Sequence, residues 1–332
     1  MAMDNGSAAN GQIDKSLFAK ATEEEKRRVE VMRESVSYWR DAVRRLLANK
    51  IATLCLIVLV IIALFAIFQP FFSVFGYAQI LQGSENLPPS GMHWFGTDNL
   101  GRDLFVRCMI GTRISLSIGV ISTLMVVVIG VFFGSVAGFF GGIVDMVIMR
   151  AVDILYGVPT VLIVIVLSVI LETSVSQVSY TTNFFTQNSN LIIIYFVLAI
   201  LYWMDMARLV RGQILSMKNN EYIAASNVLG APNGWIIRKH LIPNSIGTII
   251  VTATYVIPEA IFLEAFLSFI GLGVSVPMAS LGSLAQSGLN GIFSFPWQTF
   301  FPSLLISVII LAFNMFGDGI RDAFDPRLRN RE

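Results

Sequence analysis

The feature that most constrains this chain is a series of long apolar stretches with few charged residues. The clearest, at 51–72, has no charged residue at all, and others lie at about 114–138, 145–171, 191–206, 242–269 and 301–316. A helix needs about 20 apolar residues to cross the hydrocarbon core of a bilayer. Because these stretches are continuously apolar rather than alternating, they predict helices and not β-strands. The sequence therefore predicts an all-α membrane protein of about six transmembrane helices.

Composition supports a membrane location. Only 14% of the residues are charged, whereas soluble domains have about 25%. The net charge of +1 gives no electrostatic reason to expect a nucleic-acid partner. Membrane lipid is therefore the expected surrounding, and we expect no nucleic-acid partner.

Lysine and arginine alternate between loops, and this pattern predicts the orientation. Basic residues are dense in 1–50, in 207–241 and in the tail 319–332, whereas the loops 172–190 and 271–300 have none. Both termini are therefore expected in the cytoplasm. The exception is the loop 73–113, which is expected outside the cell although it carries three arginines.

The residues before the first apolar stretch fall into two parts. Residues 1–21 are small and polar, which predicts a disordered tail. Residues 22–50 predict an amphipathic helix that begins with a capping box of Thr22 and Glu25. This helix either lies on the cytoplasmic face of the membrane or docks on a partner subunit. The first apolar stretch begins too late for a signal peptide, so we expect the span at 51–72 to be retained.

A short helix is predicted in the basic loop after the fourth stretch, at 219–234. Asn220 is placed to cap it, and Glu221 suits its positive end. Gly230 ends the helix and Pro232 prevents its restart. The residues alone leave two interpretations: a loop that only connects two spans, or a helix whose small side chains allow another protein to approach closely.

This segment resembles the cytoplasmic signature of the permease subunits of type I ABC importers. That signature reads Glu-Ala-Ala, three residues, Gly, nine residues and Ile-x-Leu-Pro. The spacing is complete in this chain, but Ala224, Ser226 and Ile242 replace the usual Glu, Ala and Leu. The resemblance implies a coupling helix that docks on an ATP-binding subunit, although the missing glutamate leaves one ion contact in question. The residues that it implies for this coupling are Glu221, Ala224, Ala225, Ser226, Leu229, Gly230, His240 and Pro243.

Three further segments resemble the C-type permease of dipeptide and oligopeptide importers. They lie at 93–116, 264–273 and 314–328. The resemblance implies a permease core at 114–318 that forms half of a translocation pathway in a bacterial inner membrane. It also implies a second permease subunit, two ATP-binding subunits and an extracytoplasmic substrate-binding protein as partners. Related importers carry nickel, heme or glutathione, so these cargoes remain alternatives to peptides.

The chain itself is not expected to be an enzyme. It contains no Gly-Lys dipeptide and therefore no Walker A loop. ATP and magnesium are accordingly expected on partner subunits, with no cofactor or metal on this chain. Cys55 and Cys108 are expected to be free thiols. A secondary transporter or channel is the rival class of function, and it would leave a cytoplasmic docking helix unexplained.

Acidic residues inside spans usually face water or the interior of a helix bundle. Glu259, which follows Pro258, either lines the pathway and receives the amino end of a peptide or pairs with the partner permease. Glu264 is a second pathway candidate, but the favoured interpretation is that it fixes the outer end of its span. Asp205 is expected to form a helical ion pair with Arg208.

Two outer regions have alternative interpretations as well. Asp98, Arg102 and Asp103 form either a contact for the extracytoplasmic binding protein or a loop that satisfies its own charges. The loop 271–300 forms either a short outer gate helix or a plain connection.

Overall fold

The computed structural model describes residues 38–178, 189–273 and 278–324, which form helices joined by loops with no β-strand among them. Within these residues, five helices are long and apolar enough to cross a membrane, or six if the bent pair α5–α6 counts as one span. The expected tail at 1–21, the first part of the expected helix at 22–50 and residues 325–332 lie outside the described residues. The helices are α2 Tyr38–Ala48, α3 Lys50–Phe72, α4 Leu104–Phe140, α5 Gly142–Tyr156, α6 Thr160–Val178, α8 Ser189–Met217, α9 Glu221–Val228, α10 Asn233–Ile236, the π turn η2 Ile237–Leu241, α11 Ile242–Phe269, α12 Leu281–Gly288, the 3₁₀ turn η3 Leu289–Gly291 and α13 Trp297–Phe324.

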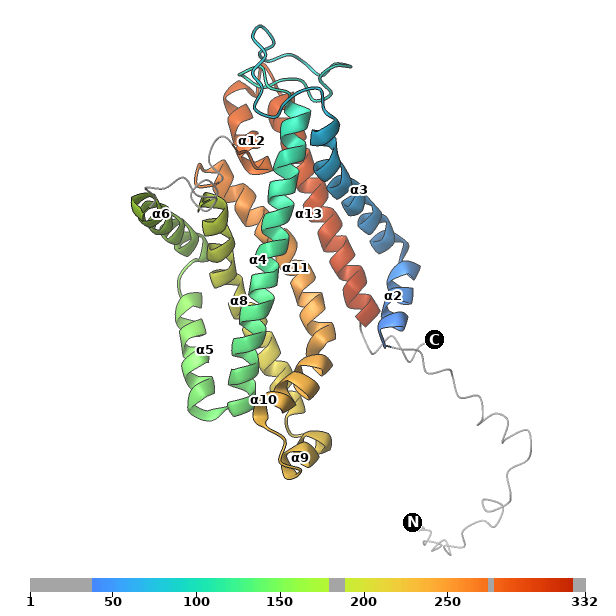
Figure 1. The fold of residues 1–332 in the computed structure, drawn as a ribbon, viewed down its shortest axis with the longest axis vertical. Coiled ribbons are helices and arrows are strands. Elements are labelled where there is room, and N and C mark those ends of the chain that lie inside the picture. The colour runs from blue at the N-terminus through green and yellow to red at the C-terminus, as the bar shows by residue number, and fades with distance from the viewer. Residues whose placement is uncertain (1–37, 179–188, 274–277, 325–332) are drawn as a thin grey trace, which may run out of the picture. The chain divides into compact units, whose positions relative to one another are not determined.

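Helix α4 is the central element, and it packs along α8, α11 and α3 (Figure 1). Its contact with α8 is very close because glycines face that helix. At Gly134 an added Cβ would lie 2.5 Å from the carbonyl oxygen of Ala207. Small residues of this kind let two membrane helices approach backbone to backbone.

Several helix boundaries differ from the predicted ones because polar caps set them. Asp103 accepts a hydrogen bond from the N–H of Val106 at 2.9 Å, so α4 begins at Leu104 and the outer loop ends earlier than expected. Asn49 accepts hydrogen bonds from Ile51 and Ala52, which separates α2 from α3 within the helix expected at 22–50. Helix α13 continues to Phe324, so the expected tail at 319–332 begins as helix.

The third predicted span, at 145–171, is wrong as a single helix. It is divided into α5 and α6, and these two helices meet at an angle of 93°. Pro159 lies in the break, where it has no N–H to donate and disfavours helical geometry at the residue before it. Gly157 ends α5 at the same place.

A short helix does form in the loop 271–300. Helix α12 begins with a capping box, in which Ser280 and Ser283 each accept a hydrogen bond from the other's backbone N–H. Its residues Leu281 and Leu284 are buried against α4 and α13. Cys55 and Cys108 are both free, as expected.

Candidate functional site

The segment after α8 forms the short helices α9 and α10, which lie at the opposite end of the bundle from α12 (Figure 1). Gly230 ends α9, as predicted. Its φ of 76° lies in the left-handed region, which glycine adopts without strain. The N–H of Gly230 bonds to the carbonyl of Asn227, and the N–H of Ala231 bonds to that of Ser226. This pair of bonds is a Schellman motif, which gives the turn a fixed shape.

The start of α9 lacks the side-chain cap that the sequence predicted. Asn220 occupies the N-cap position, but its side chain makes no capping hydrogen bond. Glu221 lies in the first turn, where its negative charge suits the helix dipole. The backbone N–H groups of Ile223 and Ala224 bond to the carbonyl of Asn220 instead.

One apolar side chain anchors α9 to the rest of the chain. Ile223 is 1% exposed and lies in a cluster with Ile214 of α8, Ile236 of α10 and Leu241 of the π turn. Burial of such a side chain stabilises the contact by about 1.5–3 kcal/mol. Ile223 therefore packs α9 against α8 and against the helical segment of α10 and the π turn.

The end of α9 presents apolar side chains to the outside. Val228 is 88% exposed and Leu229 is 87% exposed, and Tyr222 and Trp235 are also exposed. We call Val228 and Leu229 the apolar tip; Tyr222 lies in the first turn of α9 and Trp235 in α10. Of the small residues predicted for coupling, Ala224 and Ala225 are exposed, whereas the hydroxyl of Ser226 donates to the carbonyl of Tyr222. Sequence reasoning missed Val228 and Tyr222, although apolar residues in a polar loop were the available signal.

His240 and Pro243 lie where α10 passes into α11. The ring of His240 meets the edge of Trp235, with ring centroids 4.9 Å apart. Pro243 is in the first turn of α11, directly after the π turn. The structure thus places His240 near Tyr222 of α9, with ring centroids 6.1 Å apart, and Pro243 at the start of α11.

The acids of α11 have different surroundings. Glu264 is fully buried, and it accepts hydrogen bonds from Ser115 at 2.9 Å and Ser268 at 2.7 Å. Its carboxyl group therefore joins α4 to α11 inside the chain and is not exposed on the surface. Glu259, next to the buried Pro258, is exposed on the surface of α11.

Polar side chains of α8 and α5 lie near Glu259. The hydroxyl of Tyr202 donates to the backbone carbonyl of Glu259 at 3.4 Å. Asp205, one turn along α8, is also exposed and accepts a hydrogen bond from Tyr156 of α5. The expected ion pair of Asp205 with Arg208 is wrong, because Arg208 reaches Asp153 of α5 at 2.6 Å. Sequence spacing could not show that α5 lies beside α8 at this level.

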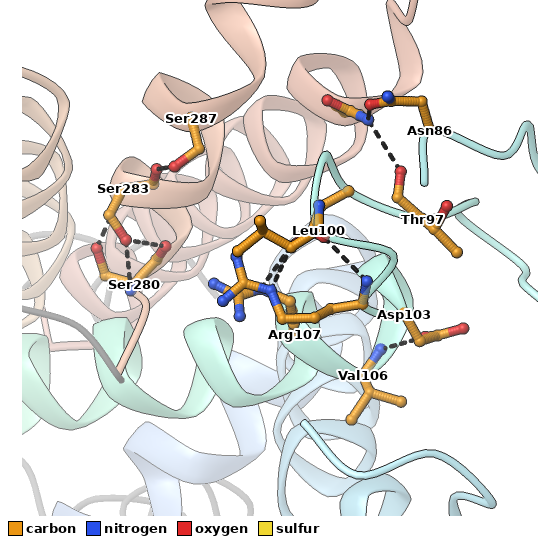
Figure 2. Close-up of polar contacts among 12 residues, drawn as sticks. Asn86, Thr97, Leu100, Asp103, Val106, Arg107, Ser280, Ser283 and Ser287 are labelled. Atoms are coloured by element: carbon orange, nitrogen blue, oxygen red, sulfur yellow. Dashed lines mark hydrogen bonds and ion pairs between the residues drawn. The ribbon is translucent and has the colours of Figure 1, made fainter. Parts of the chain in front are cut away.

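The outer loop largely satisfies its own charges. Asp98 pairs with Arg102 at 2.7 Å and lies 3.5 Å from Arg107. Asp103 pairs with His93 at 2.7 Å. It also caps α4 by accepting a hydrogen bond from the N–H of Val106 (Figure 2). Both carboxylates are buried, so they do not form a surface for another protein. The pairing of His93 was not foreseen.

This loop is also fastened to α13. Gln298 donates hydrogen bonds from Nε2 to the side chain of Asn86 and to the carbonyl of Thr97, both at 2.9 Å. Figure 2 shows Asn86 and Thr97 on the same side of the loop, with the serines of α12 across from them. This end of the bundle is therefore held by side-chain bonds from α4 and α13.

Comparison with known proteins gives the family. Residues 130–330 match the family described as "Binding-protein-dependent transport system inner membrane component", and residues 37–89 match "N-terminal TM domain of oligopeptide transport permease C".

The chain is 44% identical over 317 residues to the oligopeptide transport system permease protein OppC of Bacillus subtilis (strain 168), an alignment that covers 96% of this chain and 99% of that protein. It is 43% identical over 321 residues to the dipeptide transport system permease protein DppC of the same organism, covering 96% and 95%. It is 41% identical over 299 residues to OppC of Escherichia coli (strain K12), covering 89% and 93%. The chain therefore belongs to the family of inner membrane components of binding-protein-dependent transport systems.

Proposed function

We propose that this chain is one of two permease subunits of an ATP-driven peptide importer, and that α9 docks on an ATP-binding subunit. The observation that carries the proposal is the apolar tip. Val228 and Leu229 are almost fully exposed at the end of a helix that Ile223 holds in place. Large apolar side chains that stay exposed next to each other are a feature of interaction sites. The dipeptide and oligopeptide permeases among the relatives support peptides as the cargo.

The partner subunits supply the chemistry in this proposal. ATP and magnesium bind on two ATP-binding subunits, whose closure draws the two docking helices of the permease pair together. An extracytoplasmic substrate-binding protein delivers the peptide. The helix at Asn233–Phe269 runs without a chain break from the base of α9 across the membrane. It therefore offers a direct mechanical connection from the docking site to Glu259.

Glu259 is the pathway residue that we propose. An acid exposed on a membrane helix is stable only against water, protein or an opposite charge, because lipid does not solvate it. With Asp205 close by, Glu259 would offer negative charge to the amino end of a peptide. The change Glu259→Gln should raise the KM for peptide uptake; an unchanged KM and rate would remove Glu259 from the pathway.

Substitutions of Leu229 in the full complex, reconstituted into vesicles, test the docking. Leu229→Asp places a charge in the proposed interface, whereas Leu229→Met keeps an apolar side chain of similar volume. We expect Leu229→Asp to lower ATP-driven peptide uptake by about tenfold or more, which corresponds to the loss of at least about 1.4 kcal/mol. Leu229→Met should stay near the wild-type rate. Equal rates for the two variants would contradict docking at this residue.

The same vesicles test the two alternatives, a different class of transporter and a different cargo. Uptake that persists without ATP-binding subunits would indicate a secondary transporter or channel. ATP-driven uptake of nickel, heme or glutathione in place of peptides would keep the importer and change its cargo.

A further inference from the structure

The helix that leads from α9 into the membrane contains one irregular turn. From Asn233 to Phe269 it is a single helix, but Ile237–Leu241 forms a π turn. Ile242 donates its N–H to the carbonyl of Ile237, five residues earlier, instead of to the residue four back. Such turns are rare, and they are frequent at functional sites.

Pro243 gives a physical reason for this wide turn. Proline has no N–H, and in an α-helix its ring collides with the carbonyl four residues earlier, here that of Lys239. The next two side chains bond to carbonyls of the same turn. Asn244 donates to the carbonyl of His240 at 2.7 Å, and Ser245 donates to that of Leu241 at 2.9 Å. The local sequence therefore supports the π turn at this position.

The π turn also holds α9. His240, within it, contacts Trp235 edge to face, with centroids 4.9 Å apart, and faces Tyr222 of α9 at 6.1 Å. Ile236, directly before the turn, and Leu241, its last residue, are fully buried in the cluster that receives Ile223 of α9. The contact of His240 with Tyr222 and the packing around Ile223 thus both depend on the number of residues in this turn.

We propose that the π turn Ile237–Leu241 is the joint that fixes the direction of α9 relative to α11, with His240 as its positioning residue. The proposal rests on the proposed function, in which α9 docks on an ATP-binding subunit. In a regular helix each residue turns the chain by about 100° and advances it by about 1.5 Å. Removal of one residue from the turn would therefore point Tyr222 and Ile223 away from His240 and Leu241.

Deletion of Lys239 tests the joint in the reconstituted complex. Lys239 is exposed, so the deletion removes length without removing a buried side chain, and Lys239→Ala is the matched control. We expect the deletion variant to hydrolyse ATP while the number of peptides transported per ATP falls by about tenfold or more. Lys239→Ala should keep the wild-type ratio. A deletion variant within twofold of the wild-type ratio would overturn the proposal.

The role of His240 is tested by two substitutions at that residue. His240→Ala removes the ring, whereas His240→Phe keeps an aromatic edge for Trp235 and Tyr222. We expect the ratio of transport to ATP hydrolysis to fall several-fold in the alanine variant and to recover in the phenylalanine variant. Equal ratios in the two variants would contradict the role of the ring. If the deletion variant fails to assemble, this pair of variants decides the matter.

Leu229→Asp distinguishes failure of the joint from failure of the docking. If Leu229→Asp abolishes coupled uptake while the deletion and His240→Ala leave the ratio unchanged, only the joint is wrong. If Leu229→Asp has no effect, the docking function is wrong and the joint fails with it.

Discussion

At the scale of single residues, Gly230 sets the shape of the candidate site through its backbone. An L-residue in the left-handed region is strained by about 1–2 kcal/mol. We expect Gly230→Ala to weaken the turn after α9 by that amount, although a Cβ there would meet no neighbour within 4 Å. Coupled peptide uptake should fall several-fold. Gly234→Ala is the control, because Gly234 is also uncrowded and has no positive φ; an equal effect of both changes would contradict this reason.

Substitution of Glu264 should lower the stability of the protein, whereas substitution of Glu259 should leave the stability unchanged. Glu264→Leu would leave the hydroxyls of Ser115 and Ser268 without their acceptor in the interior, at a cost of about 1–3 kcal/mol. We expect a lower thermal unfolding temperature in detergent for Glu264→Leu and an unchanged one for Glu259→Gln. A loss of stability confined to the Glu259 variant would reverse this assignment.

Single residues also show what the sequence could and could not predict. The end of α9 was predictable because glycine at a helix end and a following proline act locally. The partner of Arg208 was not, because Asp153 reaches it from another helix. The outer loop shows the same difference, since spacing suggested a charged cluster but not the pairing of Asp103 with His93.

At the scale of elements, helix boundaries were predictable where composition changes sharply. The span predicted at 242–269 agrees with α11 because an apolar stretch follows a basic segment directly. The segment predicted as a span at 145–171 is not one straight helix, since its composition is apolar on both sides of Pro159 while the backbone bends there by 93°. Hydrophobicity shows that a segment lies in the membrane, but local backbone chemistry decides whether it stays straight.

The close contact of α4 with α8 gives a prediction for this scale. An added methyl at Gly134 would collide with the backbone of Ala207 and force the two helices apart. We expect Gly134→Ala to lower stability by about 1–3 kcal/mol, seen as earlier thermal unfolding in detergent. Gly212→Ala is the control on α8, because a methyl there meets nothing within 4 Å. Similar unfolding of the two variants would argue against a close approach of the two backbones at Gly134.

At the scale of the whole molecule, the two ends of the bundle have different features. One end has the apolar tip of α9, and the other has the charge-paired loop and α12 (Figure 1). The alternation of basic loops predicts that the α9 end faces the cytoplasm. ATP-binding subunits should therefore meet only that end, whereas an extracytoplasmic partner would approach the other.

Photo-crosslinking in the assembled complex tests this central claim most directly. A photoreactive residue would replace Leu229 in one variant and Phe293, which is fully exposed near α12, in another. The proposed function predicts a cross-link to an ATP-binding subunit from position 229 and none from position 293. A cross-link to that subunit from position 293 alone, or equal labelling from both positions, would contradict it.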